Sequence, residues 1–545
     1  MRKLVLTAAL GTASCVSAFP LYSLRFSAYQ SDGGPLWAET LKMLDAYPGT
    51  IDEVWFSSGT CLPPLAWHRA QASRQAAAAV ELRRRGIAPS LQLHATIGHS
   101  DDISTGGSSG GDCSAKDWRG WTGPTGQENL YCSCPRDPKF ISYFVEVAKI
   151  YASYRPPSVW FDDDLRIEGH RPASPWGLER DRRGCWCERC LHDFSKAEGK
   201  SYERTSLQAA MANEPALVDR WERFQFGSLA EFAGKVVATF HAESPETMFG
   251  YQHNSYPNDC QSIVYKAIRE ASGGNALGCR PGGGGYFDHS PYDQLEKAYY
   301  AAREFANIGM PEIELVCPEI ESCPRTFSCR TGQGVLLEAL ESLAMGMNSI
   351  SLFIMNCKEE TPLFFTRRFM KPLAENRTFF ADYIAYNIGA LPAGLRPKDG
   401  NLPNGMQLSC GIPLVSGYAR DCGVLDMSGV DATAISSPKL LALYARADEA
   451  SGGTLPALPL EPVQGWLLPR VLGNGVLRSV TFVNTTIDRS EPFSVRLRGV
   501  PGAVSNATWR ALGGERRNLD VLHDEKGARV EIPAVGPWNG GWLAL

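Results

Sequence analysis

The chain has 545 residues, which exceeds one ordinary domain and predicts a large domain followed by at least one more. Its formal net charge of −5 is mild and argues against a nucleic-acid partner, which would select for a concentrated basic surface. After the first residues, no stretch approaches the roughly 20 consecutive apolar residues of a membrane span, so we expect no transmembrane helix.

Residues 1–18 have the pattern of a secretory signal peptide. Arg2 and Lys3 form a basic start, an apolar run extends from Leu4 to Ala13, and small residues at 16–18 provide a cleavage site. The alternative is an ordinary apolar first strand. We expect an exported protein, periplasmic or secreted.

Residues 19–388 are predicted to form a (β/α)8 TIM barrel, because short β-type runs alternate with helical patterns. Eight runs are predicted as strands: Ser23–Tyr29, Ile51–Ser57, Ser90–Thr96, Ser158–Asp162, Thr247–His253, Ala276–Arg280, Ile313–Glu319 and Ser349–Met355. The predicted helices include Leu36–Ala46, Ala66–Arg85, Phe140–Ser153, Leu217–Ala242, Tyr292–Ala306 and Leu336–Met347. A doubly wound sheet is the alternative, but no Gly-rich phosphate fingerprint follows the first strand.

Residues 389–545 have a different pattern. Helical periodicity fades, and Pro and Gly punctuate β-type runs such as Leu477–Val483, Phe493–Leu497 and Ala528–Ile532. This segment is predicted to be a small C-terminal antiparallel β-sandwich domain.

Three consecutive carboxylates, Asp162, Asp163 and Asp164, end the fourth predicted strand. Barrel enzymes carry their chemistry at the carboxyl ends of strands. Side chains alternate along a strand, so Asp162 and Asp164 are expected to share a face unless the strand has already broken. A solvated acidic loop is the bland alternative.

A second acidic position lies on the opposite side of the expected barrel, where Glu319 ends the seventh strand and Glu321 follows. Retaining glycosidases use an acid/base and a nucleophile about 5–5.5 Å apart. Strands four and seven face each other across a barrel mouth, so these carboxylates are candidates for such a pair. Other strand-end residues are candidates for substrate binding: Arg25, Trp55, Arg166, Tyr251, His253 and Arg280.

Three cysteines are closely spaced at Cys185, Cys187 and Cys190, and Cys134 lies upstream. Four thiolates suit a tetrahedral structural Zn2+ site. Disulfides are the alternative, which export favours.

In these segments the chain resembles the family 42 glycoside hydrolases, microbial β-galactosidases with catalytic residues on strands four and seven. The similar segments are Cys134-Pro135-Arg136-Asp137-Pro138, the Asp162–Asp164 strand end, the Cys185–Cys190 cluster and Ala344-Met345-Gly346. The resemblance implies zinc at the four cysteines, Asp164 as acid/base and Glu319 as nucleophile. The family has Asn-Glu where this chain has Asp163-Asp164.

The sequence therefore predicts an exported retaining glycoside hydrolase that acts on a carbohydrate. Two alternatives stay open: a hydrolase that binds a divalent metal at Asp162, Asp163 and Asp164, and a non-catalytic glycan-binding barrel. A homo-oligomer also stays open.

Overall fold

The computed structural model describes residues 19–27, 30, 34–60, 62–98, 118, 120–168, 179–253, 259–288, 290–323, 329–355, 362–398 and 402–545. The predicted signal peptide at 1–18 lies outside the described residues. None of the helices in the described ranges is long and apolar enough to cross a membrane.

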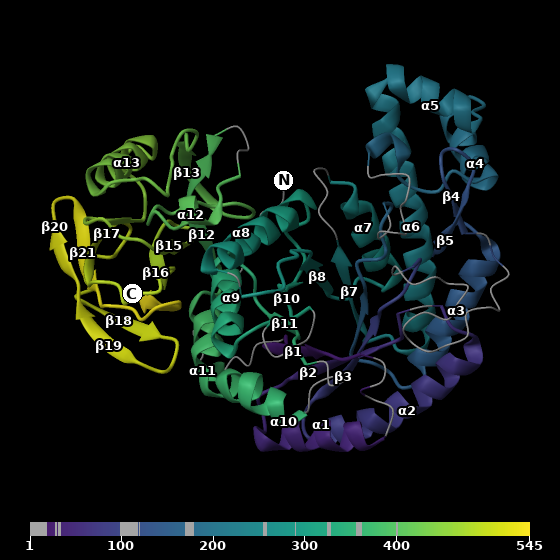
Figure 1. Cartoon of the computed structure of the whole chain (residues 1–545), viewed down its shortest axis with the longest axis horizontal. Helices are drawn as coiled ribbons and strands as arrows, with labels where there is room; N and C mark the ends of the chain where they lie inside the picture. The colour runs from purple at the N-terminus through teal and green to yellow at the C-terminus, as the bar shows by residue number, and fades with distance from the viewer. Residues whose placement is uncertain are drawn as a thin grey trace.

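The first part of the chain is a (β/α)8 barrel, as predicted, with parallel strands throughout (Figure 1). Its strands are β1 (Tyr22–Arg25), β2 (Glu53–Ser57), β3 (Ala88–Leu93), β6 (Ser158–Phe161), β7 (Met248–His253), β8 (Leu277–Pro281), β9 (Leu315–Val316), β10 (Glu319–Glu321) and β11 (Ile350–Phe353). Because β9 pairs with β8 and β10 pairs with β11, these two short strands are the halves of one seventh strand. The cyclic pairing excludes the doubly wound alternative.

Helices cover the outside of the barrel, and their starts follow simple local rules. The crossover helices are α1 (Pro35–Ala46), α2 (Leu65–Arg84), α3 (Pro138–Ala152), α6 (Pro215–Glu243), α7 (Gln261–Ala271), α8 (Pro291–Asn307), α9 (Gly332–Ala344) and α11 (Lys371–Tyr386). Asp137 caps α3 by accepting the main-chain N–H groups of Lys139 and Phe140, and Pro138 occupies the first turn. Six of these helices match the predicted ones, while α7 and α11 were not among them.

The barrel interior is filled by two stacked tryptophans. The rings of Trp55 and Trp160 lie 4.3 Å apart at 22° and have no exposed surface. A Cβ atom on Gly250 or Gly278 would approach the Trp160 ring to 2.1 Å and 2.4 Å, so glycine is required at both positions. Because strand side chains alternate, this packing fixes which residues of β7 and β8 point inward.

An excursion from the barrel lies beside α6, which at 29 residues is about 44 Å long (Figure 1). It contains β4 (Gly120–Thr122), β5 (Glu128–Ser133), α4 (Glu188–Glu198) and α5 (Arg204–Asn213). A separate small core holds it together, formed by Trp186, Leu191, Phe194, Tyr202, Leu207, Met211, Leu217 and Trp221.

The C-terminal part is a β-sandwich, as predicted. One sheet has the order β13 (Arg420–Leu425), β12 (Ala390–Pro397), β15 (Trp466–Leu472), β16 (Leu477–Asn484), β22 (Asn539–Ala544), β18 (Asn506–Ala511) and β19 (Arg516–Asp520). The other has β14 (Ala457–Pro459), β17 (Phe493–Leu497), β21 (Gly527–Ile532) and β20 (Leu522–Asp524). All ladders are antiparallel except β12–β13, and one apolar core contains residues of both sheets.

Two helices that fading periodicity did not predict accompany this sandwich, α12 (Gly405–Leu408) and α13 (Ser437–Ala450). The sandwich packs on the barrel through Trp542, whose ring centroid lies 5.4 Å from that of Tyr383 on α11. The Arg510 guanidinium also pairs with Asp382 on the same helix.

Candidate active site

A layer of polar side chains lies at the carboxyl ends of the barrel strands. Each of its six residues comes from a different strand or strand end, namely those of β1, β3, β6, β7, β8 and β10, and each is nearly fully buried. In that order they are Arg25, Gln92, Asp162, Gln252, Arg280 and Glu319. Gln252 follows Gly250 by two residues and pairs in register with Arg280, so both point into the barrel. The position of this layer is where barrel enzymes bind substrates.

Asp162 lies between two arginines and a histidine. Its Oδ1 is 3.6 Å from Nη2 of both Arg25 and Arg280, and its Oδ2 is 3.5 Å from Nε2 of His94. The other ring nitrogen of His94 contacts the Ser57 hydroxyl at 3.0 Å. The two guanidinium groups already balance the negative charge of the Asp162 carboxylate. Their positive charge also repels a divalent cation, so they oppose the binding of such an ion there.

Glu319 shares both arginines with Asp162. Its carboxylate pairs with Arg280 and lies 4.0 Å from Arg25 Nη1. Its Oε2 accepts from the Tyr286 hydroxyl and from the Gly283 main-chain N–H, both at 3.3 Å. The negative charge of Glu319, followed by burial and by the charge of Glu321, raises the pKa of Tyr286 well above its usual value. Tyr286 therefore stays protonated and donates to Glu319.

Glu321 is also held at this site. Its Oε2 lies 3.6 Å from Arg25 Nη1, and its main-chain oxygen accepts from Arg330 Nη1 at 3.1 Å. Arg25 thus contacts three carboxylates, those of Asp162, Glu319 and Glu321.

The three consecutive aspartates take different positions, because β6 ends at Phe161 and the chain turns there. The Leu165 N–H donates to the Asp162 carbonyl at 3.2 Å, which closes this turn. Asp164 has no exposed surface and accepts three hydrogen bonds, two from Thr96 and one from the Gly98 N–H at 2.9 Å. Strand alternation therefore does not extend to Asp163 and Asp164.

Asp163 is the one aspartate of the three with appreciable exposure, 18% of its side chain. It lies 3.9 Å from Arg166 Nη2, which is a long ion pair. Burial lowers the pKa of Arg280, but the charges of Glu319, Asp163 and Asp162 together outweigh burial and raise that pKa above its usual value. The charge of Asp163 also raises the pKa of Tyr286. Asp163 is thus close to the groups that hold Glu319.

Three residues predicted to contact substrate are buried elsewhere. Trp55 fills the barrel interior and donates to Glu53 at 2.6 Å. Tyr251 and His253 have the opposite alternation to Gln252, and Tyr265 of α7 lies against both. Tyr251 donates to the Leu165 carbonyl at 2.5 Å, and burial, then the Arg280 charge, lowers the pKa of His253 to about 3.

Arg25 and Arg280, which we predicted to bind substrate, lie in the polar layer, and Arg166 lies beside it. Sequence reasoning missed Gln92, His94, Gln252 and Tyr286. Gln92 accepts from Arg25 Nε at 3.0 Å. The period-two pattern of the strands places Gln92 and Gln252 on one face of their strands. It would have predicted that they point inward only if the inward face of each strand had been known.

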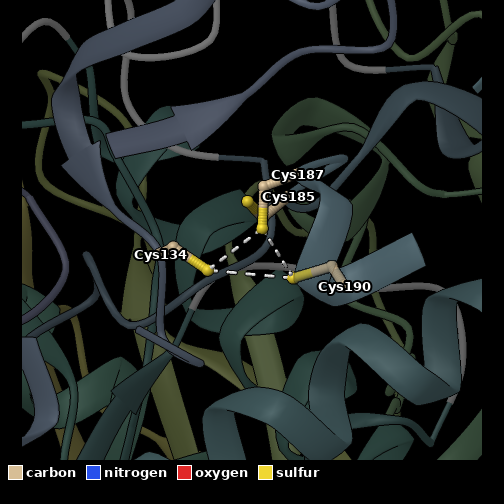
Figure 2. A group of neighbouring side chains, drawn as sticks. All are labelled: Cys134, Cys185, Cys187 and Cys190. Atoms are coloured by element: carbon tan, nitrogen blue, oxygen red, sulfur yellow. Dashed lines mark hydrogen bonds between the residues drawn. The ribbon is translucent and has the colours of Figure 1, made fainter. Parts of the chain in front are cut away.

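The four predicted zinc ligands come together in the excursion (Figure 2). Cys134 follows β5, Cys185 and Cys187 precede α4, and Cys190 lies within α4. Their sulfur atoms lie within 4.8 Å of one another, and three of the pairs are 3.6, 3.7 and 3.8 Å apart. A disulfide would bring two sulfurs to about 2.05 Å, so these cysteines are not bridged here.

The sulfur spacing fits a metal ion. Four thiolates at about 2.3 Å from a tetrahedral Zn2+ would lie about 3.8 Å from one another. All four cysteines are buried, and the Thr122 N–H donates to Cys185 Sγ at 3.5 Å. Hydrogen bonds from the other three cysteines lower the pKa of Cys187, whereas burial raises the pKa of Cys185 and hydrogen bonds raise the pKa of Cys190. Four buried cysteines that can bind one metal therefore connect the two loops of the excursion.

Several solved structures of other proteins are similar to this chain. The structure resembles a β-galactosidase from Bacillus circulans sp. alkalophilus, with a TM-score of 0.52, 10% identity, and coverage of 96% of this chain and 99% of that one. It also resembles a cold-adapted β-galactosidase from Rahnella sp. R3, with a TM-score of 0.46, 11% identity, and coverage of 95% and 98%. No family model and no curated protein matches the sequence. Identities this low bear on the fold alone.

Proposed function

We propose that this protein is an exported glycoside hydrolase that cleaves a carbohydrate by a retaining, two-carboxylate mechanism. The observation that carries the proposal is Glu319 at the end of the seventh barrel strand, held by Arg280 and Tyr286 opposite the acidic end of the fourth strand. Retaining glycosidases place a nucleophile and an acid/base on either side of the bond they break.

In this proposal Glu319 is the nucleophile. Arg280 and Arg25 stabilise the carboxylate form that attack requires. One Glu319 oxygen forms a bond to the anomeric carbon as the glycosidic C–O bond breaks and its electron pair leaves with the departing oxygen. The Tyr286 hydroxyl, on the other Glu319 oxygen, orients the carboxylate.

We assign the acid/base role to Asp163 in place of Asp164, to which the family resemblance pointed. Asp164 is fully buried and already accepts three hydrogen bonds, so it has no free oxygen directed at a substrate. Asp163 is partly exposed. It would protonate the departing oxygen and then take a proton from the water that hydrolyses the glycosyl–Glu319 ester. Asp162 has a different task, which is to hold Arg25 and Arg280 in place.

The residues of the site support a carbohydrate substrate more strongly than any one similar solved structure does. Gln252 has no hydrogen-bond partner for either amide atom in the described part of the chain, although its side chain is fully buried in the polar layer. A hydroxyl-rich ligand would satisfy such atoms. The β-galactosidase fold neighbour and the family 42 resemblance make a β-galactoside the first sugar to examine.

We further propose that the four cysteines bind one structural Zn2+. Cys134, Cys185, Cys187 and Cys190 would hold it and leave no open coordination position, so it would stabilise the excursion and take no part in the reaction. The divalent-metal alternative at the aspartates has less support, because Arg25 and Arg280 occupy the surroundings of Asp162.

The proposal is tested by assaying hydrolysis across aryl α- and β-glycosides and oligosaccharides, β-galactosides among them. The wild type should release product from at least one substrate, and Asp163→Asn should lower kcat by about 10²–10⁴-fold. Asp431→Asn, an exposed site in the sandwich, is the matched control and should behave as wild type. Saturable binding of a glycan with no turnover would instead identify a glycan-binding barrel.

A further inference from the structure

β10 is paired on one side only in the part of the barrel that the structure describes. It pairs with β11, whereas β8 pairs with β9. The Ser322 N–H donates to Phe353 O at 3.2 Å, toward β11. Alternate residues of a strand direct their carbonyl groups to opposite sides, so the carbonyls of Glu319 and Glu321 face away from β11. Buried carbonyl groups require donors.

Two buried cations supply these donors in place of a neighbouring strand. Lys297 of α8 donates from Nζ to the Glu319 carbonyl, and Arg330, which precedes α9, donates from Nη1 to the Glu321 carbonyl at 3.1 Å. Lys297 is 6% exposed and Arg330 is 1% exposed. The main-chain carbonyls of Glu319 and Glu321 are therefore held by side chains that come from α8 and from the segment before α9.

Glu338 of α9 joins the two cations. Its Oε1 is 2.9 Å from Lys297 Nζ, and its Oε2 pairs with Arg330 Nη2. Burial opposes ionisation of this carboxyl, but the charges of Arg330 and Lys297 outweigh burial and keep the pKa of Glu338 below its usual value. Arg330 Nε also donates to Asp288 at 3.1 Å. The group is thus a buried network of paired charges.

Lys297 has a second connection to the Glu319 carboxylate. Its ammonium lies 5.4 Å from the centre of the Tyr286 ring, and the Tyr286 hydroxyl donates to Glu319 Oε2. A Cβ on Gly283 would approach the Lys297 side chain to 2.6 Å, so the loop after β8 passes close against this side chain. Lys297 therefore contacts both the backbone of Glu319 and the tyrosine that orients its carboxylate.

We infer that Lys297 and Arg330, coupled by Glu338, are positioning residues for Glu319 and set the placement of its carboxylate toward the substrate. The inference rests on the proposed function for its kinetic consequence, but its structural part concerns the order of β10 alone. Small displacements of a reacting group reduce turnover far more than they weaken substrate binding.

The test uses the full chain with Lys297→Met, which keeps the apolar stem and removes the ammonium, and Lys297→Arg, which restores a cation. The Met variant should lower kcat by about 100-fold with KM within about threefold of wild type, and Arg should recover at least about tenfold of that loss. Lys235→Met, which removes an exposed i,i+4 ion pair on α6, is the control and should leave kcat unchanged.

Hydrogen exchange supplies a readout that needs no substrate. Peptides that cover residues 315–323 should exchange faster in Lys297→Met, while peptides over β3 keep the wild-type rate. If the wild type hydrolyses no glycoside, the proposed function fails, yet the exchange result still decides the positioning role. Glu338→Gln should shift both readouts in the same direction and serves if the Met variant does not fold. Unchanged exchange at 315–323, or an equal rise over the whole barrel, overturns the inference.

Discussion

Asp164 accepts two hydrogen bonds from Thr96, one from the main-chain N–H at 2.6 Å and one from the hydroxyl at 2.7 Å. With the bond from the Gly98 N–H, these contacts join the turn after β6 to the segment after β3. A buried carboxylate that accepts three hydrogen bonds is stabilised in its ionised form, which is the opposite of what a proton donor requires. Asp164 is therefore suited to anchor the turn after β6, whereas Asp163 is the partly exposed aspartate of the three.

The first prediction separates these two aspartates. In Asp164→Asn an amide NH2, which is a donor, replaces one carboxylate oxygen that accepts from Thr96 or Gly98. Two donors would then face each other in a buried position, so the free energy of unfolding should fall by about 1.5–3 kcal/mol. Asp163→Asn should keep the wild-type Tm and lose turnover, least for aryl glycosides with acidic leaving groups, which need less protonation. Chemical denaturation and kcat measurements on both variants check this. Wild-type stability in Asp164→Asn would contradict the anchoring role.

The second prediction concerns the cysteine cluster. The purified protein should contain about one zinc per chain, and Cys190→Ser should lose it, because three thiolates hold the ion less tightly than four. Removing the metal should lower Tm, since binding free energy contributes to folding. Elemental analysis and thermal unfolding measure both effects.

Cys410→Ser is the matched control, because Cys410 is buried in the C-terminal part and lies outside the cluster. It should keep both the zinc and the wild-type Tm. Intact masses that reveal disulfides among Cys134, Cys185, Cys187 and Cys190, with no bound metal, would contradict the zinc site.

The third prediction follows from Glu341 on α9, a fully buried glutamate with no hydrogen-bond partner for either carboxyl oxygen among the described residues. Burial, and next the charge of Glu338, raises its pKa well above the usual 4.5. The folded state therefore keeps a proton that the unfolded chain releases above its own pKa. This contribution to stability is present below pH 4.5 and is lost as pH rises toward the folded pKa.

Glu341→Met should remove that loss. The free energy of unfolding of the variant minus that of the wild type should increase as the pH rises above 4.5. The increase should be up to about 1.4 kcal/mol per pH unit, until the pH reaches the pKa of Glu341 in the folded protein. Thermal unfolding from pH 5 to 8 measures this difference. Glu39→Met, on an exposed α1 position, should show no such trend. A difference for Glu341→Met that stays constant with pH would show that the buried carboxyl is ionised.

Much of the fold could be predicted because strand and helix periodicities are local properties of the sequence. The eight strands were located to within a few residues, and Phe493–Leu497 was correct at both ends. The seventh strand was predicted as one element, but Cys317-Pro318 divides it, and Pro318 has no N–H to donate to a ladder. The helix α7 was not among the helices named from the sequence, although its buried Val264, Tyr265 and Ile268 follow helical spacing.

The site was harder to predict because the inward face of each strand depends on packing between distant residues. Trp160 requires Gly250 and Gly278 on neighbouring strands, which makes Gln252 and Arg280 point inward and leaves Tyr251 and His253 outside. Periodicity alone does not tell which of the two sets faces the interior.

For the aspartates the sequence left two arrangements open, and the structure has the one in which the strand has already ended, since β6 ends at Phe161 and its alternation stops there. The cysteine spacing correctly predicted that the four cysteines cluster, because three of them lie within six residues of one another, and three sulfur pairs are 3.6 to 3.8 Å apart.

The central claim is that Glu319 is the nucleophile of a retaining glycosidase, and the most direct measurement compares wild type with Glu319→Gln on the same glycoside. The amide keeps the size of the side chain and its contact with Tyr286, but it cannot form the glycosyl ester. We predict a loss in kcat of at least about 10³-fold in a variant that still folds, and product of retained anomeric configuration from the wild type. A Glu319→Gln enzyme that turns over within a few-fold of wild type, or a wild type that inverts the anomeric centre, would contradict the mechanism.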